Sequence, residues 1–185
     1  MKKILILLAL PFSLFFGSCG PREAQNEAPE NDTLVIYVGR DTLLPGEESI
    51  QMIPVPDRLI AVSSVLELSE KIRLLADSIS ACCFNNLPME ILAIDTLPET
   101  GVVLRVNLFE FPNYEGPGTM DPYQCWYDYF QGSMGGMNTS IVLRESFLQP
   151  DYDGVWIDAV AFYYQGDPIG AWDHLLLEGL LASGK

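Results

Sequence analysis

The amino-acid sequence predicts an α+β fold, a mixed or antiparallel sheet with two main helices packed on one of its faces. Runs of β-branched and aromatic residues alternate with two segments of helical periodicity, and Gly and Pro residues separate them. The predicted order is strand, strand, helix, strand, strand, helix, strand, which is typical of a sheet covered by helices on one side. The predicted domain spans residues 33–185, about 150 residues, an ordinary size for a single domain.

The first two strands are expected at the start of this domain. Residues 33–38 read Thr-Leu-Val-Ile-Tyr-Val, a β-branched and aromatic run that favours a strand. The Leu-Leu-Pro-Gly sequence at 43–46 predicts a turn. A second extended segment is expected over 49–55, ending at Pro54 and Pro56.

Residues 64–83 carry the clearest helical pattern. Ser64 and Glu67 have the spacing of a capping box, in which each side chain accepts a hydrogen bond from a first-turn amide. Apolar residues then recur at three- and four-residue steps: Val65, Leu68, Ile72, Leu75, Ile79 and Cys82. We expect an amphipathic helix packed on the sheet. A helix that binds a partner is the alternative.

A hairpin is predicted next. Residues 89–97 and 102–111 are strand-like, and the turn-type tetrapeptide Pro-Glu-Thr-Gly at 98–101 separates them. A loop rich in Gly and Pro follows at 112–122. Because apolar residues alternate with a mixed set along its second strand, we expect one face of that strand to be buried and the other to be mixed.

The second helix is expected from Ser133 to a stop at Pro150. The last strong strand is predicted over 155–164. The pattern of residues 172–181 predicts a short amphipathic helix at the end of the domain.

The N-terminal residues 1–18 have the layout of an export signal: Lys2 and Lys3, then an apolar stretch too short to span a bilayer. Gly17 and Ser18 precede Cys19, which resembles the lipobox of bacterial lipoproteins. We therefore expect Cys19 to carry lipid and to hold the protein on a membrane. An ordinary signal peptide with an incidental cysteine is the alternative.

Residues 19–32 contain no strongly apolar side chain beyond the cysteine, so they are expected to form a flexible tether between lipid and domain. Gly20, where an aspartate would signal retention in the inner membrane, is similar to lipoproteins sorted to the outer membrane. The predicted localisation is the bacterial cell envelope, anchored in the outer membrane.

The chain is strongly acidic. Its formal net charge is -15, and removal of Lys2 and Lys3 with the signal takes the mature chain to -17. A nucleic-acid-binding protein needs a basic surface, so nucleic acid is excluded as a partner. The charge is compatible with cationic partners, with calcium and with solubility alone.

Cys82, Cys83 and Cys125 follow the lipidation site. Export to an oxidising compartment allows a disulfide, but an odd number cannot all pair, and buried free thiols are the alternative. His174 is the one histidine of the chain, so no Cys/His spacing resembles a zinc site. We expect no metal and no cofactor.

The Gly-Ser-Met-Gly-Gly sequence at 132–136 is close to a nucleophile elbow, but Gln131 stands where that motif needs glycine. Our preferred interpretation is structural: Ser133 caps the second helix, and Gly135 and Gly136 permit close backbone packing. A helix start of this kind also favours anions, yet no Lys or Arg lies between Arg105 and Arg144.

Acidic residues are candidates for a pair of carboxylates that would hydrolyse a carbohydrate. The candidates are Glu110, Glu115, Asp121, Asp128, Asp151, Asp153 and Asp158. Residues 151–154 read Asp-Tyr-Asp-Gly, which matches only part of a calcium loop, so a solvated acidic loop is the preferred interpretation.

An aromatic cluster is the main candidate for a binding surface. It consists of Trp126, Tyr127, Tyr129 and Phe130. Aromatic side chains stack on sugar rings and dominate protein interfaces, and Tyr and Trp also offer a polar group. The alternative for each of them is a place in the core.

Taken together, these segments resemble the GerMN domain of sporulation and spore-germination proteins and other envelope lipoproteins. The resemblance covers about residues 33–170, and its most specific part is Gly-Ser-Met-Gly-Gly-Met-Asn-Thr at 132–139. The aromatic insertion at 112–131 and the C-terminal tail depart from the family pattern. The family is regarded as non-catalytic, so the resemblance implies no catalytic residues.

Two functions follow from the sequence. The first is a non-enzymatic envelope lipoprotein whose domain binds a cell-wall, glycan or protein partner, through the region 112–131. The alternative is an envelope carbohydrate hydrolase that uses paired carboxylates.

Overall fold

The computed structural model describes residues 31–182 of the chain. The elements in chain order are β1 (Asn31–Leu43), β2 (Ile50–Ser63), α1 (Leu68–Cys83), β3 (Met89–Leu97), β4 (Gly101–Leu108), α2 (Trp126–Phe130), α3 (Ser133–Leu148), β5 (Ala159–Tyr164), β6 (Asp167–Pro168) and β7 (Leu180–Ala182). This mixture confirms the predicted α+β class. The predicted export signal, Cys19 and most of the tether lie outside the described residues.

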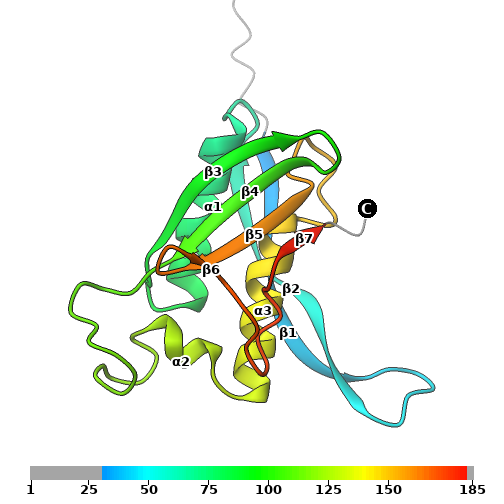
Figure 1. The fold of residues 1–185 in the computed structure, drawn as a ribbon. Coiled ribbons are helices and arrows are strands. Elements are labelled where there is room, and N and C mark those ends of the chain that lie inside the picture. Colours follow the sequence, from blue (N-terminus) through cyan, green and yellow to red (C-terminus); the bar gives the residue numbers. More distant parts are fainter. Residues whose placement is uncertain (1–30, 183–185) are drawn as a thin grey trace, which may run out of the picture.

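The strands form two sheets, where the sequence predicted one. β1 and β2 make an antiparallel hairpin, and β3, β4, β5 and β6 lie in that order in a second sheet with β7 paired to β5. β4 and β5 are parallel because the chain crosses over between them through α2 and α3. Figure 1 shows α1 and α3 behind this second sheet, while the far end of the β1–β2 hairpin projects away from it.

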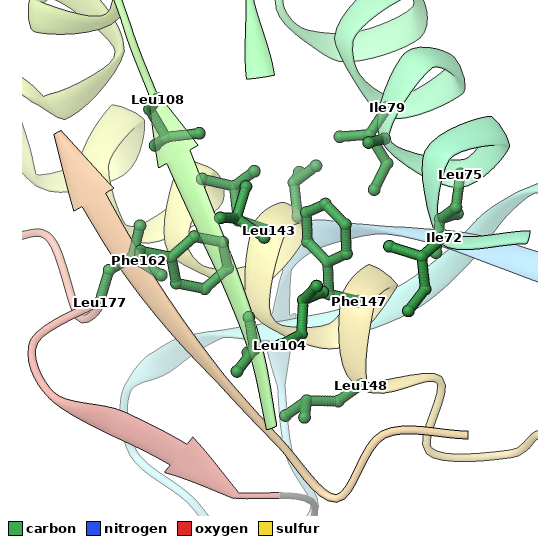
Figure 2. Packing of buried hydrophobic residues seen from close by; sticks show 14 of the residues in the cluster. Ile72, Leu75, Ile79, Leu104, Leu108, Leu143, Phe147, Leu148, Phe162 and Leu177 are labelled. Carbon is green, nitrogen blue, oxygen red and sulfur yellow. The ribbon is translucent and has the colours of Figure 1, made fainter. Parts of the chain in front are cut away.

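The core lies between the two long helices and the inner face of the second sheet. Ile72, Leu75 and Ile79 project from α1 at the predicted spacing, and all three are fully buried. Figure 2 shows them near side chains of α3, β4 and β5: Leu143, Phe147, Leu104, Leu108 and Phe162. Each such side chain stabilises the fold by about 1.5–3 kcal/mol on burial. The apolar face of α1 therefore belongs to the core.

Polar side chains of α3 and of its C-cap residue, Gln149, bond backbone groups of β1 on the edge away from β2. Gln149 accepts the Val35 N–H at 2.8 Å through Oε1, and its Nε2 donates to the Val35 carbonyl at 2.6 Å. Two more bonds follow along the strand, from Tyr37 N–H to Ser146 Oγ at 2.9 Å and from Gly39 N–H to Asn138 Oδ1 at 2.8 Å. The hairpin is thus fixed to α3 rather than to the larger sheet.

This arrangement also explains how β2 continues through two prolines. Tyr37 and Gly39 direct their N–H groups toward α3, so the residues opposite them, Pro56 and Pro54, present their backbone nitrogens on the outer edge. A proline there removes no hydrogen bond of the ladder. The prediction that the prolines end the strand was therefore wrong.

The predicted capping box of the first helix was displaced. The N-cap of α1 is Glu67, and its N–H bonds the carboxylate of Glu70 at 3.1 Å. Ser64 lies before the helix, in the turn that follows β2. In a capping box, a side chain three residues after the N-cap accepts the N–H of the N-cap residue. We assigned this role to Glu67, with Ser64 as the N-cap, but in the structure Glu67 is the N-cap and Glu70 is the acceptor.

The predicted C-terminal helix does not form. Residues 172–179 are irregular and lead into β7. Leu175 and Leu177 are buried, while Leu176 between them is 65% exposed. This two-residue alternation belongs to extended chain and not to a helix.

Within residues 31–182, no helix is long and apolar enough to cross a membrane.

Candidate functional site

The aromatic cluster is divided between core and surface. Trp126 and Phe130 are buried, with exposed fractions of 0% and 2%, so both belong to the core, and Phe130 also borders the pocket described below. Trp126 packs on Phe84 with ring centroids 4.8 Å apart, and its indole N–H donates to the Pro88 carbonyl. Burial of these two rings is favoured because each removes extensive apolar area from water. Tyr127 and Tyr129 remain half-buried.

A buried carboxylate positions the short helix α2. Glu110 is 5% exposed and accepts the N–H groups of Trp126 at 2.9 Å and Tyr127 at 3.1 Å. It also accepts the Tyr164 hydroxyl at 2.8 Å. Burial, followed by this carboxylate, raises the pKa of Tyr164 above its usual range. Glu110 therefore acts as a structural acceptor for the start of α2.

The outer side of α2 borders a pocket of about 300 Å³. The lining residues are Tyr127, Phe130, Gln131, Gly132, Ala171, Trp172, Asp173 and His174. Tyr127 and Trp172 form one wall, with ring centroids 5.8 Å apart and the rings edge to face. The volume is near the lower end of the range of about 300–1,000 Å³ for small-molecule sites.

The start of α3 forms the rim of this pocket. The N-cap is Gly132, whose φ of 73° and ψ of 149° define a backbone conformation that side chains disfavour, which accounts for a glycine here. Ser133 is the first helical residue and makes no capping bond, so the prediction that it caps the helix was wrong. Its hydroxyl instead lies 3.2 Å from Nε2 of His174.

The segment around His174 is fixed on the first turns of α3. A Cβ at Gly136 would lie 2.9 Å from the His174 carbonyl oxygen, so only glycine allows this approach. Leu176 N–H donates to Ser140 Oγ at 2.7 Å, and Leu175 is buried. The close packing predicted for Gly136 is confirmed. Gly135 has open space around its Cβ position, so the same prediction was wrong for it.

Sequence reasoning missed half of this site. Tyr127, Gly132 and Ser133 were singled out from local motifs, but Trp172 and His174 were placed in a helix that does not form. No periodicity links residues separated by 41 positions, as Ser133 and His174 are. Only the packing of the C-terminal segment on α3 reveals the pocket.

Three of the other acidic candidates have separate structural roles, while Glu115, Asp121 and Asp153 are exposed. Asp128 accepts the Tyr123 N–H at 2.9 Å, Asp151 accepts the Tyr37 hydroxyl at 2.9 Å, and Asp158 accepts the Val102 N–H at 2.7 Å. In the part of the chain that the structure describes, no three His, Cys, Asp or Glu side chains form a group able to hold a metal ion.

The three described cysteines are free thiols. Cys82 and Cys83 are half-buried at the end of α1, and Cys125 is buried before α2. Burial raises the pKa of Cys83 to about 11 and raises the pKa of Cys125 as well. Both are therefore poorly reactive at neutral pH.

A second hollow lies between the hairpin and α3 and measures about 200 Å³. Its lining residues are Met52, Pro54, Met137, Ser140, Ile141, Arg144, Glu145 and Leu176. This hollow is mostly apolar, whereas the pocket beside Trp172 combines aromatic rings with several polar groups. We therefore take the pocket beside Trp172 as the candidate binding site.

Comparison of the chain with protein-family models, with curated proteins and with solved structures gave no match. The resemblance to the GerMN domain therefore stays a prediction from the sequence pattern.

Proposed function

We propose that the protein is a lipid-anchored lipoprotein of the bacterial cell envelope whose domain binds a glycan of the cell wall. The observation that carries this proposal is the pocket of about 300 Å³ between α2, the start of α3 and the segment 171–174. By binding this glycan, the lipid-anchored domain would connect the membrane to the cell wall.

The chemistry of the pocket supports a sugar as the ligand. A sugar ring has an apolar face and a polar rim, so a site for it needs both an aromatic ring, on which the apolar face can stack, and hydrogen-bonding groups. Tyr127 and Trp172, packed edge to face, supply the aromatic rings. Gln131, Asp173 and His174 are exposed polar residues around them. This combination fixes the orientation of a small polar ligand in the way common to such sites.

The net charge narrows the class of glycan. A mature chain of charge -17 repels polyanions, which disfavours strongly acidic polymers as ligands. Among the sugars of an envelope, N-acylated amino sugars are neutral and avoid that repulsion. A cell-wall glycan with few negative charges is therefore the ligand that this pocket supports best.

The placement of the carboxylates favours binding over carbohydrate hydrolysis by a carboxylate pair. Glu110, the buried candidate, already accepts three hydrogen bonds from the protein. A carboxylate engaged in this way is not available to protonate a leaving group. Asp128 is likewise bonded to the backbone of Tyr123.

Sedimentation with purified cell-wall sacculi tests the proposal. Soluble residues 21–185 should sediment with sacculi in the presence of salt, because ring stacking and neutral hydrogen bonds are weakly screened. Trp172→Ala and Tyr127→Ala should each weaken binding about tenfold or more. Tyr123→Ala is the matched control, since Tyr123 is 55% exposed but does not line the pocket.

Equal sedimentation of the wild type and of the Trp172→Ala variant would rule out this pocket as the glycan site. Absence of sedimentation by the wild type would rule out the cell wall as the ligand.

The lipid anchor has its own test. Cys19→Ala should abolish labelling by radioactive palmitate and release the protein from the membrane fraction, because the thiol carries the lipid. Cys82→Ala should leave both labelling and fractionation unchanged. Retention of the Cys19→Ala variant in the membrane would contradict the predicted anchor.

A further inference from the structure

We propose that Ser133 and His174 form a nucleophilic pair that removes a small acyl group from an ester bound in the adjoining pocket. This goes beyond the binding function and departs from the non-catalytic role that the family resemblance implies. It uses the same pocket but does not require that the ester be part of a glycan.

The geometry of the two side chains is that of a nucleophile and its base. Ser133 Oγ lies 3.2 Å from His174 Nε2, at hydrogen-bond distance. Both residues are exposed, so a substrate can reach the hydroxyl. His174 lines the pocket, and Ser133 directly follows Gly132, which also lines it. A substrate in the pocket would therefore lie beside the pair.

Several independent contacts of the neighbouring residues hold His174 in position. Gly136 permits the His174 carbonyl to approach α3, and the Leu176 N–H donates to Ser140. On the other side of His174, Trp172 packs edge to face on Phe130 with ring centroids 5.2 Å apart. Anchors on both sides of the histidine hold its backbone in place, as a base that must meet a particular hydroxyl requires.

The backbone after Ser133 offers donors for the oxygen that becomes negative in the reaction. The first turn of α3 has no side-chain cap, and Gly136 makes the first helical bond of this turn, to the Gly132 carbonyl. The N–H groups of Met134 and Gly135 precede that bond and have no partner within the helix. Such amides stabilise a tetrahedral oxyanion next to a serine nucleophile.

The reaction has two balanced halves. As Ser133 Oγ attacks the carbonyl carbon of the ester, its proton passes to His174 Nε2, and the leaving alkoxide takes that proton as the C–O bond breaks. An alcohol leaves and the acyl group remains on Ser133. Water then loses a proton to His174 and attacks the acyl carbon. Release of the carboxylic acid returns the proton to Ser133.

The size of the pocket selects the substrate class. A volume of about 300 Å³ accepts a small ester, such as an O-acetyl group with the ring that carries it, and excludes long acyl chains. His174 has no hydrogen bond to a carboxylate among the contacts of the described residues, so turnover should be slow. A covalent probe is therefore the more sensitive test.

The test is labelling of the mature lipoprotein in detergent micelles with a small ethyl fluorophosphonate, followed by peptide mass spectrometry. The expected result is one phosphonyl group on Ser133. Ser133→Ala should take up none, and His174→Gln, which keeps a polar side chain but cannot accept the proton, should label at least about tenfold more slowly. Tyr123→Ala should label like the wild type.

The proposal is overturned if Ser133 stays unlabelled, or if His174→Gln labels as fast as the wild type. Sacculus binding by the same variants separates this result from the binding function. Loss of labelling with sedimentation intact leaves the glycan site in place. Loss of sedimentation in the Trp172→Ala variant concerns glycan binding only, and the reactivity of Ser133 is decided by whether the phosphonyl adduct forms.

Discussion

Glu110 is a single buried side chain that positions one wall of the pocket. Its carboxylate accepts hydrogen bonds from two backbone N–H groups at the start of α2 and from the hydroxyl of Tyr164. Tyr127, one wall of the pocket, is therefore held through its own backbone. An acidic residue that the sequence offered as a catalytic candidate has a positioning role in the structure.

Glu110→Gln should destabilise the fold by about 1–3 kcal/mol, because an amide nitrogen replaces one acceptor oxygen and faces buried donors. Urea unfolding followed by tryptophan fluorescence measures the change. Glu115→Gln is the matched control, since Glu115 is exposed, and it should lie within about 0.5 kcal/mol of the wild type. Equal midpoints for the two variants would contradict the structural role of Glu110.

Two neighbouring glycines of α3 should respond in opposite directions to the same substitution. Gly136→Ala should destabilise by about 1–3 kcal/mol, because its Cβ would meet the His174 carbonyl at 2.9 Å. Gly135→Ala meets open space and should stabilise by up to about 1 kcal/mol through helix propensity. Thermal unfolding of the pair provides the measurement. A stabilising Gly136→Ala would show that residues 172–176 do not rest on α3.

At the scale of elements, the junction of β1 with α3 is made of side-chain hydrogen bonds rather than a further strand. An open edge invites pairing with other chains, and here α3 covers one edge while Pro54 and Pro56 interrupt the other. The β1–β2 hairpin can therefore project from the rest of the domain without two open edges that could pair with strands of other chains.

Gln149→Ala tests this junction. It leaves the N–H and the carbonyl of Val35 without their Gln149 partners, which should cost about 2–6 kcal/mol, since each of the two orphaned groups costs about 1–3 kcal/mol. Hydrogen exchange should show the Val35 amide protected in the wild type and exchanging faster in the variant. Gln51→Ala, in the exposed part of β2, should change neither quantity. Unchanged exchange at Val35 in Gln149→Ala would contradict the role of Gln149.

At the scale of the whole molecule, one cluster joins the start of the domain to two distant parts of the chain. Asp32 accepts Lys71 Nζ of α1 at 2.5 Å and the Tyr152 hydroxyl at 2.7 Å. These bonds, first that of Lys71 and then that of Tyr152, hold the pKa of Asp32 below its ordinary value of 3.8. The first strand is thus secured where the predicted tether would join the domain.

The stability of the fold should therefore depend on the ionisation of Asp32. Because its folded-state pKa is lowered, the ionised carboxylate stabilises the fold above pH 3.8, and this stabilisation is lost as pH falls through the lowered pKa. The wild type should be more stable than Asp32→Asn near neutral pH, and the difference should shrink below that value. Thermal unfolding from pH 2 to 8 measures it. A difference that stays constant at low pH would contradict the role assigned to Asp32.

The sequence by itself determined the features that repeat along the chain. The apolar spacing of α1, the strand at 89–97 and the helix that begins at Ser133 all emerged from local periodicity, because each element buries one regular face. The aromatic cluster and the glycines of α3 were also visible. The sequence did not show which aromatic residues are buried and which lie at the surface. Trp126 and Tyr127 are adjacent aromatic residues, and only packing decides that the first is buried and the second lines a pocket.

Only the tertiary structure decided how distant segments meet. The separation of the hairpin from the larger sheet depends on Ser146 and Gln149, whose side chains replace a neighbouring strand. The pocket depends on an irregular C-terminal segment that brings Trp172 and His174 to the start of α3. Irregular chain has no period, and its position is set by hydrogen bonds and steric fit between residues far apart in the sequence. The fold class could therefore be derived from local pattern, whereas the candidate site could be derived only from the packing.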